Sequence, residues 1–142
     1  MSSTRVPLPN HNFVPEYQQS GIPFVTGSNN LDNGIVDHIQ FPTVARWFTV
    51  HSSTNGNKIV RVGFTENGVK GTETKNYYEV HPGEQTPRLE IKTKDLFIGN
   101  FSGADDAVYY VIAGLTGIPS SNFPTLTGSL EENGVKVLQG VG

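Results

Sequence analysis

The sequence predicts an all-β protein: a single domain folded as a two-sheet antiparallel sandwich, an eight-stranded jelly roll, with extended N- and C-terminal arms. Only 35% of the 142 residues are hydrophobic, whereas 16 glycines and 9 prolines supply many turns. Strand-forming residues alternate with a period of two between Phe41 and Val50. We find no helical segment long enough for a parallel α/β unit, and about eight short strand-like segments close most simply as a sandwich.

The chain divides into three expected parts. Residues 1–20 contain three prolines and no periodicity, which indicates an extended arm, residues 21–118 form the sandwich, and residues 119–142 form an extended C-terminal segment. The first part is more apolar than a solvated linker needs, so we interpret it as an assembly arm that docks on a neighbour. Its apolar residues are Val6, Leu8, Phe13, Val14 and Tyr17.

The segment from Ile35 to His51 organises the predicted sheet, because it is the longest strand-forming stretch and contains the only tryptophan. Pro42 has no amide hydrogen, so we expect two strands that meet at a bend there. Beyond the bend, alternation predicts one face with Thr43, Ala45, Trp47 and Thr49, and an opposite face with Val44, Arg46, Phe48 and Val50.

The remaining elements follow in order. Asn55-Gly56 predicts a type I′ hairpin that pairs a strand over residues 58–65 with the Trp47 strand. Residues 66–75 are expected to be a polar loop. Further strands are predicted at residues 76–81, 88–92, 95–101 and 107–115, with a last strand-like piece at 134–138 that pairs at an edge or hangs free. The 107–115 segment is the most apolar, so it should be central in its sheet.

Composition excludes several functions. The formal net charge is -3 and the ten Lys and Arg residues are scattered, so we expect no nucleic-acid partner. The absence of cysteine excludes disulfides, zinc thiolates and a cysteine nucleophile. No apolar signal region and no run of about 20 apolar residues occur, so we expect no membrane span and synthesis in a cytoplasm.

No catalytic, cofactor or metal site is predicted, and we do not expect an enzyme. Gly-x-Ser-x-Gly does not occur. Glu79 and His81 share one face of a predicted strand and are two suitable ligand types, but no third ligand is near in the sequence, so a solvated strand end explains them better.

Aromatic residues offer the alternative kind of site. Trp47, Tyr77 and Tyr78 are candidates for an exposed platform on which a sugar could stack. The competing explanation is packing with a hydroxyl hydrogen bond. Adjacent tyrosines in a strand point to opposite faces, so Tyr77-Tyr78 and Tyr109-Tyr110 should each contribute one core residue and one outward residue.

Short motifs along the chain form a recognisable series. They are residues 21–28 (GIPFVTGS), 39–47 (IQFPTVARW), 62–64 (VGF), 76–80 (NYYEV), 89–98 (LEIKTKDLFI), 113–119 (AGLTGIP) and 126–129 (LTGS). Through them the run from Gly21 to Ser129 resembles a family of small single jelly-roll virion proteins of marine viruses and large DNA viruses of algae. The resemblance implies a capsid component, either a penton protein at the vertex or a minor cementing protein, without catalytic residues.

Two functions therefore remain open. The first is a structural virion protein that contacts the major capsid protein and copies of itself, as a homo-oligomer that would be a pentamer in a penton, located in the virion. The alternative is a carbohydrate- or receptor-binding β-sandwich, such as a spike head or decoration protein.

Overall fold

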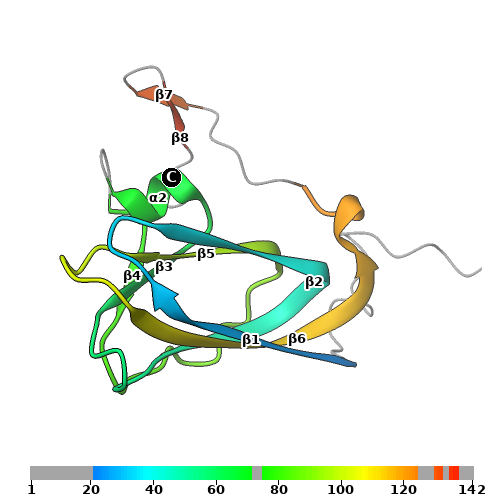
Figure 1. Cartoon of the computed structure of the whole chain (residues 1–142). Coiled ribbons are helices and arrows are strands. Elements are labelled where there is room, and N and C mark those ends of the chain that lie inside the picture. Colours follow the sequence, from blue (N-terminus) through cyan, green and yellow to red (C-terminus); the bar gives the residue numbers. More distant parts are fainter. Residues whose placement is uncertain (1–20, 72–74, 125–129, 133–134, 138–142) are drawn as a thin grey trace, which may run out of the picture.

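The computed structural model describes residues 21–71, 75–124, 130–132 and 135–137, and it confirms the all-β class (Figure 1). The predicted assembly-arm residues Val6, Leu8, Phe13, Val14 and Tyr17 lie outside the described residues. One antiparallel sheet has the strand order β1-β6-β2-β5-β3-β4, and β7 and β8 pair separately. The strands are β1 (Ile22–Leu31), β2 (Val36–Ser52), β3 (Val60–Gly63), β4 (Tyr78–Val80), β5 (Thr93–Asn100), β6 (Ala107–Pro119), β7 (Leu130–Glu132) and β8 (Val135–Val137). Two short helices, α2 (Glu66–Lys70) and the 3-10 helix η1 (Ser120–Asn122), complete the described elements.

The sheet bends sharply within β2, near Pro42. The first half of β2 pairs with β5, and this register breaks between Gln40 and Ala45, whereas the second half pairs with β6. Tyr109 lies opposite Ser52 near the end of β2, yet its hydroxyl donates a hydrogen bond to Asp37 Oδ2 at 2.7 Å near the start of the strand. A straight strand would hold these two ends about 50 Å apart. The two halves of the sheet therefore face each other, in a sandwich-like arrangement (Figure 1).

We name the two layers by their strands. The β1–β6 layer contains β1, β6 and the second half of β2, and the β5–β3 layer contains the first half of β2, β5, β3 and β4. A single main core cluster lies between the layers and draws on all six strands. Phe41 and Phe24 illustrate the contact, because their rings meet edge to face with centroids 5.1 Å apart. The prediction that residues 107–115 are central is confirmed, since β6 lies between β1 and β2.

The predicted alternation along β2 fails at one point. Ala45 was expected to share a face with Trp47, but Ala45 is buried in the main core with Phe48 and Val50. The register explains this, because Ala45 pairs with Leu115 and Trp47 pairs with the very next residue of β6, Gly114. One extra residue on β2 is a β-bulge, which reverses the side-chain alternation beyond it.

The predicted Asn55-Gly56 hairpin is wrong, because β3 pairs with β4 and β5 instead of β2. Both sides of the second half of β2 are already occupied, one by β6 and the other by residues 83–89. Leu89 N donates to Phe48 O at 2.9 Å, and Thr86 N donates to Val50 O at 2.8 Å. Residues 83–89, rather than 88–92, therefore provide the pairing segment here.

The predicted polar loop at residues 66–75 contains α2. Thr65 caps this helix by accepting a hydrogen bond from Gly68 N, and Gly71 ends it in the left-handed conformation with φ 66°. Val69 lies directly on two glycines of the sheet. A Cβ added at Gly99 would be 2.6 Å from one Val69 methyl group, and a Cβ added at Gly63 would be 2.7 Å from the other. The helix therefore covers the outer face of the β5–β3 layer (Figure 1).

We predict that Gly99→Ala destabilises the protein by about 1–3 kcal/mol, because the new methyl group would overlap with Val69 and the Phe101 ring. Gly21→Ala is the matched control, since no atom lies within 4 Å of its added Cβ. Urea unfolding followed by circular dichroism measures both free energies. Equal stability of the two variants would contradict the close packing of α2 on the sheet.

We also predict that Tyr109→Phe lowers the free energy of unfolding by about 1–2 kcal/mol, because the hydrogen bond to the Asp37 carboxylate is lost. Tyr110→Phe is the control, since the Tyr110 side chain is 44% exposed whereas Tyr109 is 3% exposed. The split of this tyrosine pair into one core and one outward residue is confirmed.

The same variant tests a pH effect. Burial, the hydrogen bond to Asp37 and the negative charge of Asp37 all raise the pKa of Tyr109 above its ordinary value. Above a pH of about 10 the unfolded tyrosine therefore loses its proton while the folded one retains it, so the folded state loses stability. The stability advantage of the natural protein over Tyr109→Phe should shrink as pH rises from 9 towards about 11. A constant difference would contradict the assignment.

Candidate functional site

The outer face of the β1–β6 layer carries several exposed apolar residues, among them Val25, the most exposed large hydrophobic residue of the described chain. Cross-strand register places Val25, Ile112 and Thr49 in one row across β1, β6 and β2. Val25 is 69% exposed and Ile112 is 47% exposed. Phe24 precedes Val25 on β1, and Ala113 follows Ile112 on β6. Both of these neighbours face the core instead. The alternation of the strands thus leaves a row of aliphatic side chains in solvent.

A second row extends the apolar surface along the sheet. It consists of Gly27, Tyr110 and His51. The Tyr110 ring lies over Gly27, because a Cβ on that glycine would be 2.8 Å from Tyr110 Cδ1, and it stacks with His51 at a centroid distance of 6.2 Å. Glycine is required at position 27 for this ring to lie against the strand.

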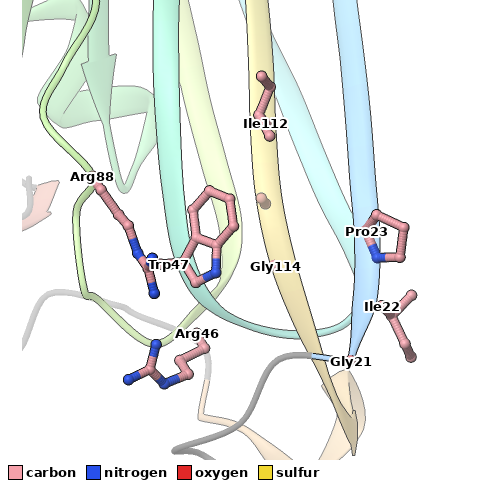
Figure 2. Close-up of a pocket in the computed structure, with 9 residues that line it drawn as sticks. Gly21, Ile22, Pro23, Arg46, Trp47, Arg88, Ile112 and Gly114 are labelled. Atoms are coloured by element: carbon pink, nitrogen blue, oxygen red, sulfur yellow. The ribbon is translucent and has the colours of Figure 1, made fainter.

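The third row forms a hollow. Pro23, Gly114 and Trp47 lie opposite one another on β1, β6 and β2. Because Gly114 has no side chain, the space between Pro23 and Trp47 is open, and the hollow has a volume of about 390 Å³ (Figure 2). Gly21, where the described part of the chain begins, also lines this hollow. We call the residues Pro23, Val25, Trp47, Tyr110 and Ile112 together the outer-face patch.

The end of the hollow beside Trp47 is positively charged. Arg46 Nη1 lies 3.0 Å from one carboxylate oxygen of Glu90, and Arg88 Nε lies 2.8 Å from the other. The Arg88 guanidinium also lies over the Trp47 ring, 4.8 Å from its centroid, in a cation–π contact. Two guanidinium groups share one carboxylate, so the described residues leave one positive charge at this end of the patch without a partner.

The three predicted platform aromatics do not form one site. Trp47 lies in the outer-face patch, whereas Tyr77 and Tyr78 line a separate hollow with Phe64 and Lys75. Tyr78 is 58% exposed, although it lies opposite the core residue Val62 on β3. Tyr77 does not belong to the core cluster either, so the prediction of one core and one outward residue is wrong for this pair.

Tyr77 is held in a packing role. The Arg61 guanidinium lies 4.1 Å from the Tyr77 ring centroid and 4.5 Å from that of Phe101. The same Arg61 donates hydrogen bonds from Nη1 to the carbonyl oxygens of Val69 and Lys70 at the end of α2. The Tyr77 ring therefore packs on Arg61, the residue that links the end of α2 to the sheet.

Sequence reasoning did not identify Val25, Ile112 and Gly114 as parts of a site. Their alternation was visible within each strand, but the row depends on the register between β1, β6 and β2. Within the described residues no group of three potential metal-ligating side chains occurs. The described helices include none that is long and apolar enough to cross a membrane.

Comparisons of the chain with protein-family models, curated proteins and solved structures gave no match. The geometry of the outer-face patch therefore carries the functional argument.

Proposed function

We propose that the fold is a jelly roll in its finer topology. If β2 is divided at Pro42 and residues 83–89 are counted as a strand, the described residues before position 120 form eight strands. Numbered in chain order, they would lie as 1-8-3-6 in one layer and 2-7-4-5 in the other, which follows from the observed pairings. This order of two antiparallel layers, related by Greek-key connections, supports the jelly-roll assignment.

We further propose that the chain is a structural virion protein, a penton or minor capsid subunit that assembles with copies of itself and with other capsid proteins. The observation that carries this proposal is the uncovered outer-face patch of the β1–β6 layer. The outer face of the opposite layer has α2 packed on Gly63 and Gly99, whereas no described helix or strand packs on Val25, Tyr110 and Ile112. Contiguous exposed apolar surface of this kind marks a protein–protein contact site.

The composition and position of the patch support an interface. Tyrosine is enriched among the residues that dominate binding energy, and Tyr110 stands on a rigid sheet where its ring is already oriented. The patch also adjoins β1, which is an edge strand of the sheet and a second surface for contact with a neighbour. A ring of subunits would use two different surfaces on each copy, one of them the patch.

The arm prediction is compatible with this position. Gly21 N donates a hydrogen bond to Leu115 O at 3.2 Å, so residues 1–20 join the described chain beside the patch. Docking of the arm on a neighbour stays a prediction.

We predict that Val25→Lys weakens self-association at least about tenfold, because a lysine would place an unpaired charge in a dry contact. Ile35→Lys is the matched control, since Ile35 is 51% exposed but does not belong to the patch. Size-exclusion chromatography with light scattering over a range of concentrations measures both, and thermal unfolding confirms that each variant folds. A monomeric natural protein, or equal behaviour of the two variants, would count against assembly through this face.

Quantitative mass spectrometry of purified particles tests the virion role directly. About 60 copies per icosahedral particle would indicate a penton subunit, because each of twelve vertices holds a ring of five. A much larger number would indicate a cementing or decorating subunit. Absence of the chain from particles would overturn the virion proposal and favour the alternative, a carbohydrate- or receptor-binding module, which the hollow beside Trp47 supports.

A further inference from the structure

We propose that the hollow between Trp47 and Pro23 binds a pyranose sugar that carries a carboxylate. The site would be a ligand-binding function beyond assembly, and its argument does not depend on the assembly proposal. Trp47 and Pro23 stand on β2 and β1 as opposite walls, with Gly114 of β6 as the floor between them (Figure 2).

The size and lining of the hollow suit one sugar ring. Its volume of about 390 Å³ lies within the roughly 300–1,000 Å³ of small-molecule sites. Pro23, Trp47 and Ile112 give it apolar surface, and Arg46 and Arg88 give it charged groups. A sugar acid has both apolar C–H groups and a carboxylate to match this lining.

The indole of Trp47 also suits a sugar ring. Aromatic faces carry negative electrostatic potential, which attracts the positively polarised C–H groups of a pyranose. Arg88 also lines the hollow, and it comes from residues 83–89, which pair with β2 on the side away from β6 (Figure 2). The guanidinium of Arg88 holds the indole in place by the 4.8 Å contact described above.

The charge at the end of the hollow specifies an acidic sugar. Arg46 also lines the hollow, and its Nη1 shares Glu90 with Arg88. A guanidinium has five N–H donors, so one shared carboxylate does not satisfy both arginines. A ligand carboxylate at Arg46 would supply the missing negative charge and form charge-assisted hydrogen bonds. A neutral ring would use the walls alone, and a small anion would use the arginines alone.

Titration with methyl β-D-glucuronide tests the proposal, with methyl β-D-glucoside as the neutral control of the same ring. The full chain contains one tryptophan, so intrinsic fluorescence reports Trp47 specifically. We expect a saturable change with the glucuronide at a Kd of about 1 mM, typical for a ligand of this size in an open site. The glucoside should bind at least about tenfold more weakly.

Matched variants separate the charge from the fold. Arg46→Gln should weaken glucuronide binding at least about tenfold, and Arg46→Lys should retain part of it because the positive charge remains. Lys75→Gln makes the same change of net charge in a different hollow and should leave binding unchanged. Val25→Lys should also bind the glucuronide, so that failure of assembly and failure of this site are distinguishable.

Four results would overturn the inference. They are no saturable change with the glucuronide at tenfold above the expected Kd, equal binding of the glucoside, unchanged binding by a folded Arg46→Gln variant, and tighter binding of the probe N-acetyl-glutamyl-tyrosine amide. The last result would assign the hollow to an acidic, aromatic segment of a protein partner instead of a sugar.

Discussion

The bend within β2 is the constraint on which the rest of the structure depends. Pro42 cannot donate to a ladder, and the bulge between Ala45 and Trp47 turns the strand further, so one long strand can serve both layers. This geometry encloses the core between the two halves of a single sheet. It also brings Tyr109 to Asp37, where a buried hydroxyl finds an acceptor that a straight strand would have placed far away.

The two layers use glycine for opposite purposes on their outer faces. Gly63 and Gly99 clear the space into which Val69 of α2 packs, so that this face is closed by the chain itself. Gly27 lets the Tyr110 ring lie against the sheet, and Gly114 leaves a hollow beside Trp47, so that the other face presents rings and space to solvent. In the β5–β3 layer, α2 covers the outer face, whereas no described helix covers the outer face of the β1–β6 layer. We infer that the second face is available for contacts with other molecules.

Local patterns in the sequence predicted those features of the fold that are decided by residues close together in the chain. The all-β class, the central position of β6 and the split of Tyr109 and Tyr110 all follow from alternation and composition. Asn55-Gly56 misled because turn preference is local, whereas strand pairing is decided by which edges are free. The bulge and the hollow could not be predicted, because both depend on how β2 registers with β6. The α2 helix had local signals in its cap residues, Thr65 and Gly71, but Gly68 within the helix and its short length obscured them.

The position of the hollow determines whether assembly and ligand binding compete. The row of Val25 and the row of Tyr110 form the apolar part of the patch, and the hollow with its arginines lies in the next row, towards the end at which β1 begins. Protein interfaces commonly bury an apolar centre and leave a polar, hydrated rim. A neighbour centred on the Val25 and Tyr110 rows would therefore place Arg46 and Arg88 at its rim, where charged groups remain in water. An assembled subunit could then keep the hollow open to a small acidic ligand.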